Sequence, residues 1–568
     1  MTIFTAMPLR RLLPLMLAAA VFALPVPAFA SAHITVVNVD GPNEGFNDPT
    51  PAAPVGGNPG TTKGQQRLIA FQFAADLWGA SLDSNIDIQI QASFDPLGAN
   101  VLGAAGAAFS IRNFNGLAAA GFPGGDANTN YHIALADKRA GFDLLTAFGL
   151  MPATPEIVAQ FSSDFDFYLG LDNNHGLKND LVVVLLHELG HGLGFSSFMS
   201  RTTGNTPGGV TDPFLNNALD GSTNTPLSAL LASTPAVRLA AIQKVDQIVW
   251  TGGNVAAAVP STLLFGRPEL DAPTLPSIDG TRYGTASFGP PVPATGITGM
   301  VIVAQDGVGV STDACEPLTA ASAVAVHGNI ALVDRGTCTF TVKVKNAQNA
   351  GAIAVLVADN VADNPPATLG GADPTITIAS VRVLRSTGDA IKAATASGPL
   401  TLTIALNQAR RAGTDLQDRP QLYASTPIAP GSTLNHWDPI AFRNLLMEPA
   451  INGDLTHSLL PPFDVTLAEM HDMGWFTDAD LDGNEDATVI LNGCDTRVEN
   501  GLIGTGALLS DQARVWFGQC AATTSNAKAF ERCVDDLAKA AHEDGIITGK
   551  QSSHVRQCAQ ATGNHKGS

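Results

Sequence analysis

The segment LVVVLLHELGHGLGF, residues 181–195, constrains the fold more than any other part of the chain. Its first six residues are all apolar, so the segment is predicted to lie inside a protein core. In an α-helix, residues four positions apart share a face and lie about 6 Å apart along the axis. His187 and His191 can therefore point at one place, with Glu188 beside them and Asp180 as the N-cap. Ionisable side chains in so apolar a helix need partners that offset the cost of their burial.

The pattern HExxH is typical of a zinc site, in which two histidines bind the ion and the glutamate reaches a water molecule. A catalytic zinc usually has three protein ligands and one open position, so a third ligand is required. The metzincin spacing would place a histidine at position 197, where this chain has Ser197. In the thermolysin-like arrangement, the third ligand is a carboxylate on a second helix. Asp246 is the best candidate for it, although that arrangement normally uses a glutamate.

A second motif, NHWDPIAFRNLLMEP at residues 435–449, lies much further along the chain. Together with HELGHGLGF it resembles the leishmanolysin family of secreted zinc proteases. In that family HExxHxxGF is followed by an insertion, then a histidine–tryptophan pair, then a turn whose methionine lies beneath the zinc. The segment LAEMHDMGWF, residues 467–476, is also similar to the family.

This resemblance implies a metzincin-like site with a distant third histidine and one catalytic Zn²⁺. The residues that it implies are the ligands His187, His191 and His436, the general base Glu188 and the Met-turn residue Met447. Three other histidines could compete for the third position, although solvated or hydrogen-bonded roles suit them better: His327, His457 and His471.

His436 lies 245 residues after His191, much further than in the simplest members of that family, and an inserted unit explains most of the difference. From about residue 280, short β-branched runs such as NIALVDRGTCTF and AIAVLVADN are separated by turns, which predicts a compact α/β unit. Residues 284–405 resemble the protease-associated (PA) domain through the tripeptide DRG, the sequence NAGA and the flanking Cys315 and Cys338. The resemblance implies an accessory domain without chemistry of its own, which either contacts the substrate or acts as a spacer.

The first thirty residues have the pattern of a signal peptide. Arg10 and Arg11 precede an apolar run, and AFA at residues 28–30 is a small-residue cleavage signal. The run is short and interrupted by prolines, which disfavours a membrane anchor. The mature chain is therefore expected to be exported, either secreted or periplasmic. An even number of cysteines in an exported chain predicts disulfides among Cys315, Cys338, Cys494, Cys520, Cys533 and Cys558.

The charge balance excludes some partners. The formal net charge is −20, and it becomes −22 without Arg10 and Arg11, because 29 basic residues then face 51 acidic ones. Such a field repels nucleic acid and anionic membrane surfaces. Hydrophobic residues make up 45% of the chain and charged residues 14%, which favours folded domains over long disordered segments.

An acidic turn, DADLDGNED, separates the second zinc motif from the C-terminal region. Asp478, Asp480 and Asp482 alternate as in the first half of a calcium loop, and Ca²⁺ is the ion they would bind. The twelfth loop position is Val489 rather than glutamate, so a solvated turn between domains explains the pattern equally well. Beyond it, amphipathic stretches between cysteines predict a small helical module held by disulfides.

These observations predict an α+β architecture. The expected parts are a signal peptide (1–30), a zinc protease domain in two pieces (31–275 and 410–476), an inserted PA domain (284–405) and a C-terminal module (477–568). The expected function is a secreted zinc endopeptidase that cleaves proteins or peptides with a metal-activated water. The PA resemblance favours peptide substrates by analogy only. Two alternatives remain, namely a secreted zinc-containing binding or adhesion protein without turnover, and a zinc hydrolase of non-peptide substrates.

Overall fold

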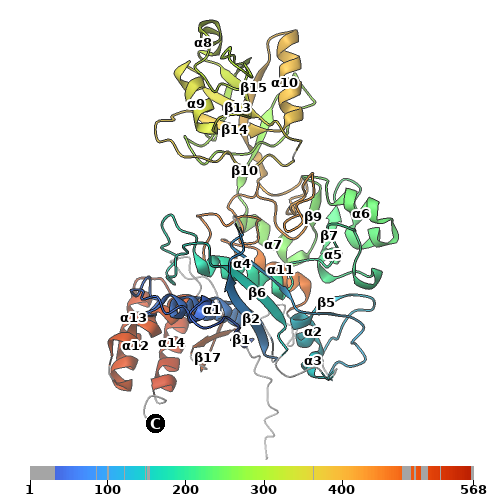
Figure 1. Cartoon of the computed structure of the whole chain (residues 1–568). Helices are drawn as coiled ribbons and strands as arrows, with labels where there is room; N and C mark the ends of the chain where they lie inside the picture. Colours follow the sequence, from blue (N-terminus) through green and yellow to red (C-terminus); the bar gives the residue numbers. More distant parts are fainter. Residues whose placement is uncertain are drawn as a thin grey trace, which may run out of the picture.

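The computed structural model describes residues 32–475 and 488–563, apart from 83, 85, 99–100, 120–121, 148, 150–153, 363, 492–493, 500–508 and 525. Figure 1 shows a central body, a separate unit above it and a group of three helices at the lower left. The expected signal peptide lies outside the described residues, and so do the three aspartates of the acidic turn, Asp478, Asp480 and Asp482.

A four-stranded sheet forms the centre of the body. Its order is β1-β2-β6-β3, with β1, β2 and β6 parallel and β3 antiparallel at the edge: β1 Ile34–Asn38, β2 Ile88–Asp95, β6 Ile157–Ser162 and β3 Gly103–Ala107. Burial alternates at the start of β2: Ile88 and Ile90 are buried on one face, while Gln89 and Gln91 are only partly buried. The glycine and alanine residues of β3 give no such alternation, and its strand is defined by pairing with β6.

Two long helices, α1 (Lys63–Ser81) and α4 (Leu181–Leu193), pack against this sheet and against each other. Thr62 is the N-cap of helix α1, and its side chain accepts a hydrogen bond from the Gln65 amide. The buried Trp78 of α1 donates its indole N–H to the carbonyl oxygen of Leu186, 3.1 Å away in α4. The predicted buried helix is therefore confirmed, and it lies at the centre of the main hydrophobic core.

Shorter elements surround this core (Figure 1). They are η1 Gly45–Asn47, β4 Ser110–Ile111, β5 Tyr131–His132, α2 Ile133–Ala140, α3 Leu144–Ala147, η2 Pro207–Gly209, α5 Pro213–Asn217, β7 Ala218–Asp220, β8 Thr225–Pro226, η3 Leu227–Ala232, α6 Pro235–Ala241, β9 Ile248–Trp250, α7 Gly253–Thr262 and α11 Thr466–Met473. Strands β8, β7 and β9 form a small sheet, and β4 pairs with β5.

The upper unit is built on a six-stranded sheet of order β10-β15-β11-β12-β13-β14. Its elements are β10 Phe265–Asp271, β11 Ile297–Val303, α8 Ala320–Val326, β12 Ile330–Asp334, α9 Phe340–Asn349, β13 Ala354–Ala358, β14 Ala379–Val383, α10 Arg385–Ser397 and β15 Thr401–Arg411. Strands β11 to β14 are parallel, and β10 pairs antiparallel with β15 as a stem toward the body (Figure 1). Because of this stem, the sheet extends beyond the expected limits of the insert, 284–405, on both sides.

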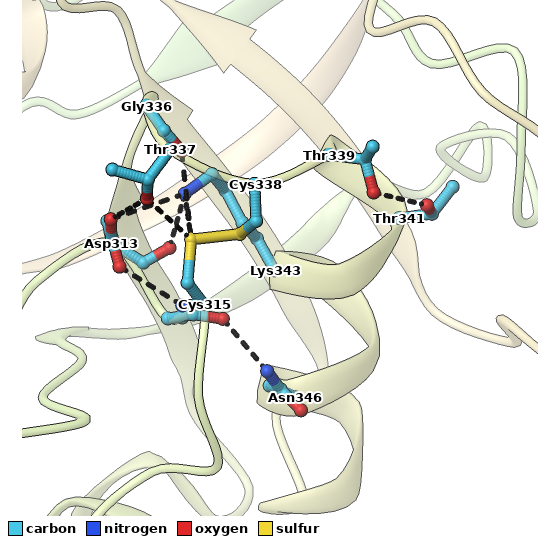
Figure 2. The surroundings of a disulfide bond; sticks show 10 residues. Asp313, Cys315, Gly336, Thr337, Cys338, Thr339, Thr341, Lys343 and Asn346 are labelled. Atoms are coloured by element: carbon cyan, nitrogen blue, oxygen red, sulfur yellow. Dashed lines mark hydrogen bonds and ion pairs between the residues drawn. A yellow bond between two sulfur atoms is a disulfide. The ribbon is translucent and has the colours of Figure 1, made fainter. Parts of the chain in front are cut away.

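Two of the six cysteines, Cys315 and Cys338, form a disulfide in this unit, with 5.7 Å between the Cα atoms. It joins the loop before α8 to the start of α9, as Figure 2 shows. Asp313 organises the loop, because its carboxylate accepts bonds from the Cys315 amide and the Thr337 hydroxyl. The buried Lys343 of α9 donates to the Asp313 carbonyl oxygen at 2.7 Å.

The C-terminal module packs beside α1 and contains a β-hairpin as well as the predicted helices. Its elements are β16 Thr488–Leu491, β17 Cys494–Glu499, α12 Leu509–Thr523, α13 Ala527–Glu543 and α14 Gly549–Gly563. A disulfide joins Cys520 to Cys533, and Cys558 is disulfide-bonded as well. The side chain of Cys494 lies outside the described residues. Among the residues with described structure, no helix is both long and apolar enough to cross a bilayer.

Candidate metal centre

Helix α4 carries the first two candidate ligands, and both of its ends are fixed by side chains. At its start, the Asp180 carboxylate accepts a hydrogen bond from the Val182 amide at 2.8 Å and lies 3.1 Å from His457 Nε2. At its end, Gly194 has a φ of 143°, and Trp475 donates its indole N–H to the Leu193 carbonyl at 2.9 Å. The helix therefore holds its polar side chains at one fixed place in the core.

The structure brings three histidines together. His191 Nε2 lies 3.2 Å from His187 Nε2 and 3.2 Å from His436 Nε2. His187 and His436 are buried, and His191 is partly buried. The predicted trio is therefore assembled from two elements that the whole insert separates in the sequence.

The other ring nitrogen of each histidine is hydrogen-bonded to a backbone carbonyl. His187 Nδ1 lies 2.7 Å from Leu446 O, His191 Nδ1 lies 2.8 Å from Phe195 O, and His436 Nδ1 lies 2.9 Å from Ser432 O. Since a carbonyl oxygen only accepts, each Nδ1 carries the proton. Each neutral ring therefore presents its Nε2 lone pair to the other two.

This donor set suits a divalent metal ion. Burial lowers the pKa of His187 to about 4 and that of His191 to about 3, and it also holds the pKa of His436 well below its usual value. All three rings are thus neutral at pH 7, and their converging lone pairs repel one another unless a cation lies between them. Three neutral imidazoles, each oriented by a hydrogen bond at Nδ1, are a ligand set that fits zinc.

Glu188 lies beside this trio, against the edge strand β3. The Ala105 backbone amide hydrogen-bonds its carboxylate, and burial raises the pKa of Glu188 to about 8. A cation at the histidines would favour its ionised form. A Cβ atom at Gly103 would lie only 2.9 Å from Glu188 Cγ, so a side chain at 103 would displace the glutamate. Sequence reasoning missed Gly103 and Ala105, whose only signal was a run of small residues.

Met447 lies directly beneath the helix. A Cβ atom at Gly190 would stand 2.8 Å from Met447 Sδ, so the glycine between the two histidines admits the thioether. The Trp437 amide donates to the Met447 carbonyl at 2.8 Å, which ties the methionine turn to the segment of the third histidine. The buried Glu448 closes the turn by accepting the Leu445 amide at 2.9 Å.

Arg201 connects the end of the helix to the third-histidine segment, and no sequence pattern indicated it. Its guanidinium donates to the Ser197 carbonyl at 2.9 Å, to the Thr433 carbonyl at 2.9 Å and to Asn435 Oδ1. The Ser197 amide also donates to Asn435 Oδ1, at 3.0 Å. The Ser197 hydroxyl donates to the carboxylate of the buried Asp212 at 2.9 Å. Ser197, at the position of the metzincin histidine, therefore has a structural role.

The remaining candidates for the third position lie elsewhere. Asp246 forms ion pairs with Arg267 and Arg282, at 2.8 Å and 2.6 Å. His457 is engaged by Asp180 at the start of the helix. His471 lies in α11, and His327 follows α8 in the upper unit. None of the four belongs to the group of described residues that surrounds His191.

Comparison with known proteins identifies one domain. Residues 296–391 match the PA domain model. One relative is receptor homology region, transmembrane domain- and RING domain-containing protein 1 of Oryza sativa subsp. japonica, with 37% identity over 19% of this chain and 19% of its own length. Another is the probable lipoprotein aminopeptidase LpqL of Mycobacterium tuberculosis, with 32% identity over 20% of this chain and 21% of its own. The chain therefore spans only about a fifth of the length of these relatives.

Among solved structures, an aminopeptidase from Aneurinibacillus sp. strain AM-1 is similar at 27% identity. The similarity covers 23% of this chain and 29% of that one, with a TM-score of 0.18. A TM-score of this size carries no inference about the remainder of the chain. The chain thus contains a PA domain, and the body with its three clustered histidines must be understood from its own geometry.

Proposed function

We propose that this chain is a secreted zinc-dependent endopeptidase of the metzincin type, similar to leishmanolysin. The observation that carries the proposal is the convergence of three neutral imidazoles beside a buried glutamate. His187, His191 and His436 would hold the ion, and Glu188 would be the general base. Met447, packed under Gly190, would support the floor of the site.

The chemistry follows from what each residue can do at its position. When bound, zinc polarises a carbonyl group and lowers the pKa of a water molecule. Glu188 accepts the proton of the attacking water and returns it to the leaving amine. The Ala105 amide holds the carboxylate in place, and the carbonyls that bind each Nδ1 hold the imidazole rings. This division of roles makes Glu188 essential for turnover but not for metal binding.

Several features support the substrate class and the location. A PA domain lies within the chain, and a relative that is 32% identical over 20% of the chain is named as an aminopeptidase. The disulfides Cys315–Cys338 and Cys520–Cys533 favour an oxidising compartment. An N-terminal signal pattern agrees with export. Peptide substrates outside the cytoplasm are therefore the proposed targets.

Hydrolysis of an unfolded protein by the mature chain would test the proposal, with Glu188→Gln assayed beside it at matched zinc content. We expect the wild type to cleave and the variant to lose at least about 100-fold in kcat, because the general base is gone. N-terminally acetylated peptides would be assayed in parallel. Cleavage of these blocked peptides at internal bonds distinguishes an endopeptidase from an aminopeptidase.

Two results would contradict the proposal. Equal cleavage by the wild type and Glu188→Gln would remove the proposed mechanism. A wild-type protein that binds zinc but cleaves neither free nor blocked peptides would favour the binding-protein alternative.

A further inference from the structure

Arg282 connects the inserted unit to the segment that carries the third histidine. Its guanidinium forms two hydrogen bonds with the Asp438 carboxylate, at 2.7 Å and 2.9 Å. The Asp438 side chain is 0% exposed and that of Arg282 is 6% exposed, so the pair is closed off from water. A two-pronged arginine–carboxylate bond fixes both distance and orientation.

The backbone of Arg282 belongs to the sheet of the inserted unit. It forms a β-bridge with Glu269 of β10, the stem strand between the unit and the body (Figure 1). Two residues later, Gly284 exchanges backbone hydrogen bonds with Arg382 of β14, both at 2.8 Å. The position of the guanidinium is therefore set by the insert.

A second carboxylate completes the junction. Asp246 accepts Arg282 at 2.6 Å and Arg267 at 2.8 Å, and it belongs to the body before the insert. Arg267 also donates to Gln421 at 3.1 Å. Arg282 thus joins a segment that precedes the insert to one that follows it. Arg267 pairs with Glu269 as well, at 3.4 Å, so the junction contains carboxylates of both the stem and the body.

Asp438 connects Arg282 to the candidate metal centre, because Asp438 lies two residues after His436. Its amide donates to the Gln421 carbonyl at 2.9 Å, and its carboxylate accepts the Ile440 amide at 3.0 Å. The Tyr423 amide donates to the His436 carbonyl at 2.8 Å. Residues 436–440 therefore form a short bonded strip with the metal-facing histidine at one end and the Arg282 pair near the other.

We infer that Arg282 is a positioning residue for the metal centre, through which the seating of the PA-containing insert sets the place of His436. The inference rests on the proposed zinc site. Without Arg282, the Asp438 carboxylate stays buried but loses its two-pronged partner. Residues 436–440 must then move so that water can reach this carboxylate. Some residues orient the metal ligands without binding the metal themselves. Replacing such a residue typically lowers metal affinity or activity 10- to 100-fold.

The test uses the full mature chain and compares Arg282→Gln with Arg410→Gln. Arg410 is a matched control, because it is an arginine of the same stem that pairs with Glu269 at 3.0 Å, and among the described residues it forms no ion pair with Asp246 or Asp438. Zinc affinity would be measured by chelator competition, and the Co²⁺ absorption spectrum would report the ligand geometry. We expect Arg282→Gln to weaken zinc binding about 10-fold or more and to lower kcat more than it changes KM. Arg410→Gln should remain within about twofold of the wild type.

Arg282→Lys keeps the positive charge but cannot form the two-pronged bond, and we expect an intermediate zinc affinity. If Arg282→Gln does not fold, the inference is decided by Arg282→Lys and Asp438→Asn, with the same two readouts. A folded variant with wild-type zinc affinity and a wild-type Co²⁺ spectrum would overturn the inference. Metal analysis of the wild type separates the two proposals: a wild type without zinc ends both, whereas a zinc-binding wild type unaffected by Arg282 ends only this one.

Discussion

At the scale of single residues, the metal centre depends on two glycines that make room for other side chains. Gly190 admits Met447 beneath the helix, and Gly103 admits Glu188 beside the edge strand. Neither glycine is needed for an unusual backbone angle, so the requirement comes from space alone. Both positions are therefore sensitive to the addition of one methyl group.

We predict that Gly103→Ala lowers kcat about 10- to 100-fold while zinc content stays at the wild-type level. The added Cβ atom would lie 2.9 Å from Glu188 Cγ and 3.1 Å from Phe161 Cδ1, so the glutamate must leave its position. A small displacement of a catalytic group costs about 100-fold in rate. Turnover and metal content would be measured on the same preparation.

Gly106→Ala is the matched control on the same strand, because a Cβ atom there meets nothing within 4 Å. We expect it to retain wild-type turnover. An equal loss of turnover in both variants would mean that the strand, rather than the space beside Glu188, is sensitive.

The sequence indicated His187, Glu188 and His191 because the HExxH spacing can be recognised directly in the chain, and the family resemblance implied His436. The residues that hold them, such as Arg201 and Arg282, were not predictable in this way. Each bonds to segments distant in sequence, and neither has a neighbouring residue that marks its role. Long-range partners of this kind become visible only once the chain is folded.

At the scale of elements, the sequence predicted those strands and helices that contain runs of apolar side chains. The parallel strands of the PA-containing unit were visible as β-branched runs between turns, and two of them, β13 and β14, are buried on both faces. Strand β3 was not, because its glycines and alanines carry almost no side-chain pattern and the strand exists through its pairing with β6. The hairpin of the C-terminal module was missed as well, since the cysteines and amphipathic stretches there indicated helices.

The parallel strands β13 and β14 of the PA-containing unit are joined by a buried carboxylate that makes this unit acid-sensitive. Burial raises the pKa of Asp359, but hydrogen bonds from Arg335 and Arg382 outweigh it and hold that pKa below its usual value of 3.8. The ionised form therefore stabilises the folded unit above about pH 4, and this stabilisation is lost as the pH falls through the lowered pKa.

We predict that Asp359→Asn lowers the free energy of unfolding at pH 7 by about 3 kcal/mol, because two arginines lose their buried partner. The variant should also lose stability less steeply than the wild type below pH 4. Thermal unfolding between pH 2 and pH 7 would measure both effects. Asp389→Asn, an exposed carboxylate on α10 of the same unit, is the control and should follow the wild-type curve. Parallel curves for Asp359→Asn and the wild type would contradict the prediction.

At the scale of the whole molecule, the body and the PA-containing unit have separate hydrophobic cores. The proposed metal ligands all belong to the body. Removal of zinc should therefore destabilise the two parts unequally.

We predict that chelation lowers the unfolding temperature of the body and leaves the transition of the PA-containing unit in place. Zinc at a thousand times its Kd contributes about 4 kcal/mol to the folded state that binds it. Calorimetry of the full chain with and without chelator would measure the change, and Glu188→Gln should respond as the wild type does. An unchanged thermogram, or an equal shift of both transitions, would contradict the prediction.

The distance of 245 residues between His191 and His436 also has a consequence for how the protein is made. During synthesis the first two histidines emerge long before the third, and the entire insert is translated between them. A truncated chain that ends within the insert would carry the HExxH helix but would lack the third proposed ligand. The proposed zinc site is therefore completed late, after the insert has been synthesised and the segment of His436 has packed against the body.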